Sequence, residues 1–233
     1  MKFVLAPLAL LWISASVAVA EESNPVVVEL YTSQGCSSCP PADALMHKLA
    51  EQEDVIGLAL HVNYWDYIGW KDEFADPAHT IRQQGFAQAG GRSMIYTPQM
   101  IINGQEDVVG ARGMELMEHI GKHRAATPVA KAKAELSDGQ VVISVNTTGR
   151  ALTGEYDVFL VNYTPARRVS IKRGELAGET LDYANVVESW TQVGSWDGQG
   201  QNTLTTPMIR DEPAVVLVQQ VNHGSIVAAA RVR

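Results

Sequence analysis

The pattern of apolar and polar positions changes near residue 125. Upstream, short apolar runs alternate with segments in which apolar residues recur every three or four positions, the spacing of a helix with one buried face. Downstream, short Val-rich runs are separated by Gly, Asn, Asp and Pro, which favour turns. The pattern predicts an α/β domain at residues 21–124 followed by a β-rich accessory domain at residues 125–233.

The first upstream elements form a β-α-β unit. Residues 25–31 are apolar on both faces, as buried parallel strands are. Helical spacing runs from 40 to about 53, and a second apolar strand follows at 55–62. Strands joined in this way are parallel, and their carboxyl ends lie at one edge of the sheet. We therefore expect the turn that carries Cys36 to lie beside residues 63–67.

The remaining upstream segments continue this domain. Residues 66–90 predict a helical insertion that ends at two glycines. Residues 94–110 predict a hairpin, with a proline immediately before its first strand. Residues 113–122 have the spacing of a closing helix. The predicted order is β-α-β, insertion, β-β-α.

The downstream segments predict an antiparallel sheet or a small sandwich. The predicted strands are 130–136, 140–146, 156–162, 168–173, 186–193, 214–221 and 225–232. The last two are joined by the turn sequence Asn222-His223-Gly224. No motif for chemistry stands out in this part of the sequence. We expect it to extend or cover the first domain.

The N-terminus has the pattern of a secretory signal peptide. Lys2 precedes an apolar stretch that ends in small residues at Ala20, which predicts a leader at residues 1–20. The stretch is too short and too rich in small residues for a membrane span, which needs about 20 apolar residues. The predicted cleavage point carries no cysteine, so the sequence does not indicate a lipid anchor. We expect a periplasmic or secreted protein without a stable membrane anchor, in a compartment where a dithiol stays oxidised.

Composition narrows the function classes. The formal net charge is −8, which argues against nucleic-acid binding because phosphates attract basic surfaces. Hydrophobic residues make up 46% of the chain, enough for a core and too many for a disordered protein. No nucleophilic triad or phosphate-binding loop is found in the sequence.

The two cysteines carry the clearest chemical signal. Cys36 and Cys39 lie two residues apart in the turn between the first strand and the first helix. This spacing is typical of redox-active dithiols and of metal sites. Two thiolates can bind Cu(I), with Met46, Met94 or Met100 as a soft third ligand, so a periplasmic copper chaperone is one alternative. A binding module with an inert disulfide is another alternative. A zinc site would need two further ligands, and no Cys or His lies at the usual spacing to supply them.

Four segments carry a family resemblance: residues 28–43, 61–67, 69–72 and 96–100. They resemble a secreted, thioredoxin-like family of Gram-negative bacteria known as domain of unknown function 1223, within the thioredoxin superfamily. The resemblance implies a thioredoxin-like fold for residues 25–124 and a disulfide between Cys36 and Cys39. It implies thiol–disulfide exchange with protein partners, without an organic cofactor.

The resemblance also implies roles for individual residues. Cys36 would be the nucleophile, and Cys39 would resolve the mixed disulfide. Thr97 and a cis Pro98 would hold an extended partner segment. Glu29 takes the place of a buried acid of the superfamily if one residue is inserted in the turn, and it would accept the proton of Cys39. A membrane electron donor or acceptor would complete the cycle.

Two further groups near the dithiol admit two interpretations. Tyr64 and Trp65 are expected beside Cys36, where they either bind the partner or pack in the core. His61 ends the second strand, and we expect it to be a structural residue.

Residues around the cysteines have opposing effects on the thiolate. Ser37 and Ser38 add hydroxyl donors, which stabilise a thiolate and favour a more oxidising pair. Pro40 and Pro41 remove two N–H donors from the start of the helix, which weakens this effect. The direction of the redox reaction therefore stays open.

Overall fold

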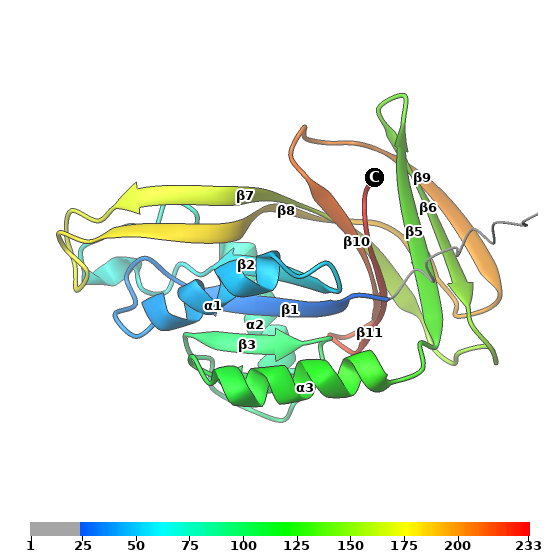
Figure 1. Ribbon diagram of the computed structural model, residues 1–233, viewed down its shortest axis with the longest axis horizontal. Helices are drawn as coiled ribbons and strands as arrows, with labels where there is room; N and C mark the ends of the chain where they lie inside the picture. The colour runs from blue at the N-terminus through cyan, green and yellow to red at the C-terminus, as the bar shows by residue number, and fades with distance from the viewer. Residues whose placement is uncertain (1–23) are drawn as a thin grey trace, which may run out of the picture.

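The computed structural model describes residues 24–233, and the expected signal peptide lies outside this range. The described chain has an eight-stranded mixed sheet and a three-stranded antiparallel sheet (Figure 1). Its helices are α1 (Pro40–Ala50), α2 (Pro77–Ala89), α3 (Gly113–Ala125) and the short 3-10 helix η1 (Asp66–Ile68). Within residues 24–233, none of the helices has the length and apolar character to cross a membrane.

The larger sheet has the strand order β11-β10-β7-β8-β2-β1-β3-β4. Its strands are β1 (Val26–Thr32), β2 (Val55–His61), β3 (Gln99–Ile102), β4 (Glu106–Val109), β7 (Tyr156–Ser170), β8 (Thr180–Trp196), β10 (Ala214–Gln220) and β11 (Ile226–Arg231). The smaller sheet has the order β5-β6-β9 and consists of β5 (Ala130–Ser137), β6 (Gln140–Thr147) and β9 (Gln201–Pro207).

The predicted β-α-β unit is confirmed. β1 and β2 are parallel, with Thr32 opposite His61 at their carboxyl ends. α1 starts with two prolines, which are tolerated in a first turn because the N–H groups there have no partner within the helix. The insertion, the β3–β4 hairpin and α3 follow in the predicted order. This order places the carboxyl end of β1, and the cysteines after it, at one edge of the sheet.

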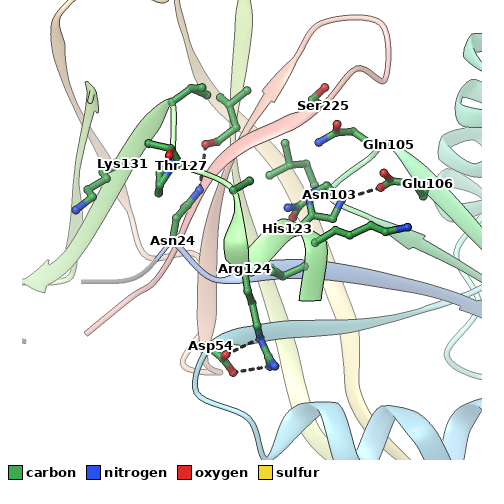
Figure 2. Close-up of a pocket in the computed structure, with 17 residues that line it drawn as sticks. Asn24, Asp54, Asn103, Gln105, Glu106, His123, Arg124, Thr127, Lys131 and Ser225 are labelled. Carbon is green, nitrogen blue, oxygen red and sulfur yellow. Dashed lines mark hydrogen bonds and ion pairs between the residues drawn. The ribbon is translucent and has the colours of Figure 1, made fainter. Parts of the chain in front are cut away.

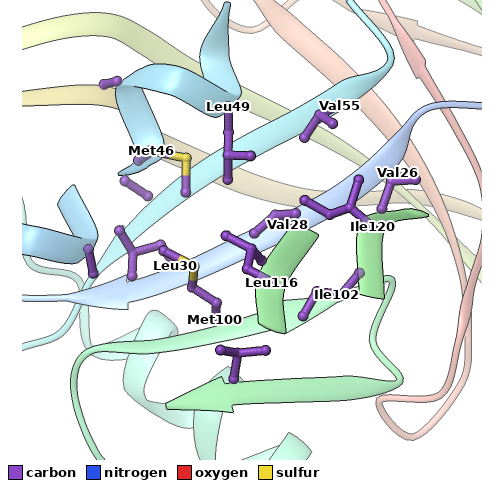
Figure 3. Packing of buried hydrophobic residues seen from close by; sticks show 14 residues of the cluster. Val26, Val28, Leu30, Met46, Leu49, Val55, Met100, Ile102, Leu116 and Ile120 are labelled. Atoms are coloured by element: carbon purple, nitrogen blue, oxygen red, sulfur yellow. The ribbon is translucent and has the colours of Figure 1, made fainter. Parts of the chain in front are cut away.

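α1 and α3 cover one face of the sheet (Figure 3). Their buried side chains pack against alternate residues of β1, because successive residues of a strand point to opposite faces. The cluster includes Val28, Leu30, Met46, Leu49, Met100, Ile102, Leu116 and Ile120. Gly57 lets α1 approach β2 closely, since a Cβ at this position would lie 2.5 Å from the sulfur of Met46. The site is therefore built on a tightly packed layer.

α2 covers the opposite face together with apolar residues of the downstream strands. This second cluster includes Val27, Tyr31, Leu58, Leu60, Phe86, Val161, Val187, Val215, Leu217 and Ile226. Residues from before and after position 125 thus share one core. The fold class expected from the sequence, an α/β domain with a helical insertion and appended antiparallel strands, is confirmed.

The downstream strands divide between the two sheets. β7, β8, β10 and β11 extend the larger sheet, and β8 meets β2 in parallel at Ala59 and Val186. β5 and β6 pack their buried residues against the other side of β7 and β10. The two strands expected at 156–162 and 168–173 are one continuous strand, β7, and β9 had no counterpart in the sequence prediction. A boundary between two domains near residue 125 stays a prediction.

Candidate active site

The dithiol lies in the turn between β1 and α1. Cys36 and Cys39 form a disulfide, and their exposed fractions are 1% and 0%. The turn is closed by two backbone hydrogen bonds, from Cys36 N to Ser33 O and from Cys39 N to Cys36 O, both 3.1 Å long. The cysteine side chains are therefore held by the fold and are nearly covered in the oxidised protein.

One hydroxyl group contacts the first sulfur. Ser38 Oγ lies 3.4 Å from Cys36 Sγ, and the hydroxyl donates because a disulfide sulfur carries no hydrogen. The start of α1 has few free backbone donors for this sulfur. Its first two residues are prolines, and the next two N–H groups donate to the carbonyl oxygen of Cys39 over 2.8 and 3.1 Å. Ser38 is thus the polar side chain next to the nucleophile position.

Trp65 connects the dithiol turn with the segment before β3. Its indole Nε1 donates to Thr97 Oγ1 over 2.6 Å. Its other side packs on Gly35, where a Cβ would lie 3.1 Å from Trp65 Cβ. The peptide bond between Thr97 and Pro98 is cis. The structure therefore brings Trp65 to the residue that precedes Cys36 and connects Thr97 to Trp65 through the indole N–H.

The neighbouring tyrosines differ in exposure. Tyr67 stacks on Trp65 with ring centroids 6.4 Å apart, and it is 79% exposed. The hydroxyl of Tyr64 donates to Gln83 Oε1 of α2 over 3.1 Å, and burial raises the pKa of Tyr64 to about 12. Tyr64 thus fixes α2, while Tyr67, the last residue of the segment 63–67 expected beside Cys36, presents an aromatic ring to solvent.

Glu29 does not occupy the place expected from the sequence. Arg82 of α2 donates to both of its carboxylate oxygens over 2.7 and 2.8 Å, and the hydroxyl of Tyr31 donates to it over 3.0 Å. The next residue, Leu30, packs on the α1 face, so Glu29 points to the α2 face. The alternation of β1 directs Glu29 away from Cys39, and its expected role as proton acceptor does not fit this placement.

Asp43 is the buried acid on the dithiol side of the sheet. It lies one helical turn after Cys39, and its Oδ1 accepts a hydrogen bond of 2.8 Å from Thr32 Oγ1. Its other oxygen, Oδ2, is buried without a hydrogen-bond partner. Burial raises the pKa of Asp43 to about 7. The helical spacing predicts that Asp43 lies on the polar side of α1, whereas the structure buries it, with 6% of it exposed.

His61 and Asp72 form a second buried group beside Asp43. His61 Nδ1 lies 2.7 Å from Asp72 Oδ2, and both side chains are buried. Asp72 Oδ2 also accepts the backbone N–H of Gln34 over 2.8 Å, which ties it to the dithiol turn. The ring of Tyr183 from β8 packs edge-on against His61 at 4.7 Å. The sequence assigned no role to Asp72, which lies in the segment 69–72 that carries the resemblance, or to Tyr183, which lies 122 residues after His61.

The three methionines suggested as soft ligands lie in different environments. Met46 and Met100 are buried in the core beneath α1 and α3, and Met94 is 77% exposed. Within residues 24–233, no three or more His, Cys, Asp or Glu side chains are grouped so that they could hold a metal ion. The two buried methionines are accounted for by core packing.

A separate pocket of about 750 Å³ lies at the other end of β1 (Figure 2). It is lined by Asn24, the last turn of α3 and the start of β11. Its charges are paired within the protein: His123 Nε2 lies 2.7 Å from Glu106 Oε2, and Arg124 Nε lies 2.6 Å from Asp54 Oδ2. The pocket shares no lining residue with the dithiol turn.

Comparisons with known proteins agree with this fold. Residues 27–219 match the family model described as "Protein of unknown function (DUF1223)". The crystal structure of protein AGR_C_4864 from Agrobacterium tumefaciens is similar, with 33% sequence identity and a TM-score of 0.78 over 91% of this chain and 95% of that chain. A polysaccharide monooxygenase, CBM33, aligns with a TM-score of 0.23 and 14% identity over 43% of this chain and 60% of that chain, too weakly to carry an argument. Among curated proteins, none matched.

Proposed function

This chain belongs to the DUF1223 family, described only as proteins of unknown function, and we propose its function from the dithiol itself: thiol–disulfide exchange with protein partners. The observation that supports this most directly is the Cys36–Cys39 disulfide at the end of β1. The element order around it and its two-residue spacing further support membership of the thioredoxin superfamily.

The proposed reaction exchanges one disulfide for another. The Cys36 thiolate attacks a sulfur of the partner disulfide, and the partner's first thiolate leaves. Cys39 then attacks Cys36 Sγ, which forms the Cys36–Cys39 bond and releases the partner's second thiolate. The partner gains two electrons and two protons, and the dithiol loses them. The reverse sequence oxidises a partner dithiol.

We infer that the partner binds as an extended segment along the edge formed by Thr97, Pro98 and Trp65. The support is the chain of contacts from Thr97 through Trp65 to Gly35, next to Cys36. Tyr64 contributes by fixing α2 beneath this edge. Because Cys36 is 1% exposed, part of its cover must move before a partner sulfur can reach it.

We further propose that the reaction takes place in the periplasm or outside the cell, after removal of a signal peptide that ends near Ala20. The leader pattern of the sequence supports this location. In that compartment a membrane protein would supply or accept the electrons. Fractionation of cells that express the tagged full chain tests the location.

The proposed function is tested by trapping the mixed disulfide. Cys39→Ser leaves Cys36 able to attack but removes the residue that releases the partner. We expect this variant to capture periplasmic proteins in adducts that a reducing agent dissolves, and Cys36→Ser to capture none. In parallel, equilibration with glutathione buffers gives the reduction potential. The proposal would be overturned if the wild-type protein exchanged with neither glutathione nor a model protein disulfide. If its reduced form also bound Cu(I) tightly, copper binding would be the better-supported function.

A further inference from the structure

Residues 66–71, which include η1, lie against the two residues that precede Cys36. A Cβ on Gly35 would lie 3.4 Å from the Cδ1 atom of Ile68. The indole Nε1 of Trp70 donates to the side-chain oxygen of Gln34 over 2.8 Å, and Gln34 is fully buried. Residues 66–71 therefore form a cap over the dithiol turn.

The cap is fixed at both ends. At one end, Trp65 donates to Thr97, and at the other, Asp72 accepts the backbone N–H of Gln34 over 2.8 Å. In the described part of the chain, the backbone hydrogen bonds that leave the cap reach only its chain neighbours Asn63 and Trp65. The cap is thus outside the hydrogen-bonded sheet, and segments of this kind open locally at a lower free energy than core strands.

The tip of the β7–β8 hairpin, residues 171–179, supports the cap. A Cβ on Gly174 would lie 3.3 Å from Trp70 Cβ and 3.6 Å from the carbonyl oxygen of Ile68. Trp70 and Leu176 also pack against one buried cluster, formed by Val169, Ile171, Tyr183 and Val186. Trp70 thus connects the hairpin tip, which comes from the part of the chain after position 125, with Gln34 of the dithiol turn.

The cap is the part of the cover whose movement disturbs least of the fold. The dithiol turn also contacts β1, which pairs with β2 on one side and β3 on the other, and Cys39 is the N-cap of α1. Moving either element would break strand pairing or the core beneath α1. Moving the cap breaks the bond between Trp70 and Gln34 and a few packing contacts.

We propose that the cap moves away from the dithiol turn when Cys36 reacts, that Trp70 holds it closed, and that the β7–β8 hairpin tip determines how often it opens. The inference rests on the proposed function, since an exchanging dithiol must be reached by a partner. Trp70 is a positioning residue, because it acts on Cys36 through Gln34. Trp65 stays bound to Thr97 when the cap opens, so the edge for the partner segment is kept.

Access to the oxidised dithiol is measured with the water-soluble tris(carboxyethyl)phosphine, which reduces a disulfide once it reaches a sulfur atom. Under native conditions the rate of reduction should follow the open fraction of the cap. Trp70→Phe keeps a ring but loses the bond to Gln34, and we expect it to accelerate reduction about three- to tenfold. Leu176→Ala, in the hairpin tip, should accelerate it as well.

Trp196→Phe is the matched control. The Trp196 indole donates to the carbonyl oxygen of Gln199 over 3.2 Å, and its ring packs in the cluster beneath the smaller sheet. We expect the wild-type rate for this variant. Urea unfolding of all variants separates access from general stability, because a purely structural role of Trp70 would lower the urea midpoint without accelerating reduction.

A double variant tests whether the hairpin tip acts through Trp70. Trp70→Ala removes the side chain that the tip supports. Adding Leu176→Ala to Trp70→Ala should therefore accelerate reduction no further, whereas Leu176→Ala alone accelerates it. Additive effects of the two substitutions would contradict a route through Trp70.

Hydrogen exchange gives a second measurement. In Cys39→Ser, a small thiol coupled to Cys36 needs space that the cap covers. We expect the Trp70 indole N–H and the amides of residues 66–71 to exchange faster in this adduct than in the uncoupled variant. Equal reduction rates for Trp70→Phe and the wild type, or unchanged hydrogen exchange, would overturn the movable cap while thiol exchange stands. Faster reduction of the variants, in a protein that captures no partner through Cys36, would instead overturn the proposed function and leave the cap.

Discussion

At the scale of single residues, Ser38 is the side chain that touches the Cys36 sulfur. Its hydroxyl can donate to the thiolate in the reduced protein, and a hydrogen bond to a charged group is worth about 1.5–3 kcal/mol. We expect Ser38→Ala to raise the pKa of Cys36 by about one unit or more. Ultraviolet absorbance of the thiolate, followed against pH, measures this shift. Ser37→Ala is the matched control, and equal shifts in the two variants would show that Ser38 has no special role.

The burial of Asp43 leads to a second prediction at this scale, about the pH dependence of the free energy of unfolding. Its pKa is about 7 in the folded protein and near 3.8 when unfolded, so the folded state binds more protons between these values. The free energy of unfolding should therefore fall as pH rises from about 4 to about 7, by roughly 4 kcal/mol at most. Asp43→Asn should lack this contribution. Urea unfolding at several pH values tests it, and a constant difference between variant and wild type would contradict it.

The contrast between Glu29 and Asp43 shows what the sequence could reveal about the site. The spacing of the cysteines and the proline before β3 placed Cys36, Cys39, Thr97 and the aromatic segment at one edge. The buried acid was placed wrongly, because one inserted residue reverses the face to which a strand side chain points. Helical periodicity did not reveal Asp43 either, because a charged residue next to the apolar face of α1 is assigned to its polar side.

At the scale of elements, a buried ion pair fastens α2 to β1. Arg82 binds both oxygens of Glu29, and its guanidinium carbon lies 3.9 Å from the ring centroid of Trp190 in β8. Removing one member leaves the other charge buried and unpaired. We expect Arg82→Met to lower the free energy of unfolding by about 3–5 kcal/mol. Urea denaturation monitored by circular dichroism measures the loss.

The double variant Arg82→Met/Glu29→Met separates charge from packing. It should recover much of the lost stability, because no charge remains buried. A double variant as unstable as Arg82→Met alone would show that the pairing is not the cause. Glu29→Gln should leave the pH profile of exchange unchanged, since Glu29 lies on the α2 face.

Some elements were easier to predict than others. Strands and helices around the dithiol have strong periodic patterns, and their order was predicted correctly. β7 was divided in the prediction because Pro165 and the charged Arg167–Arg168 pair interrupt its apolar pattern, yet the strand runs through them. Pairing with β8 along its whole length stabilises this polar stretch, and such pairing is not visible in local sequence.

At the scale of the whole molecule, the downstream strands complete the site. β7 and β8 reach past the end of β2 (Figure 1). In this region Tyr183 packs on His61 and Phe74. Nothing in the local sequence marks Tyr183, because its contact partner His61 in β2 lies 122 residues earlier in the chain. Residues after position 125 therefore contact the buried group behind the dithiol turn.

The shared core leads to a prediction about cooperativity. Residues of β1 and β2 pack with residues of β7, β8 and β10 in one cluster, and Arg82 lies against Trp190. A fragment of residues 24–124 would expose this apolar face and lose the contacts of Arg82 with the rings of Phe159 and Trp190. We expect the full chain to unfold in one transition, with fluorescence and circular dichroism coinciding, and the fragment to show no cooperative transition. A fragment that folds alone, or two separated transitions in the full chain, would establish residues 24–124 as an independent domain.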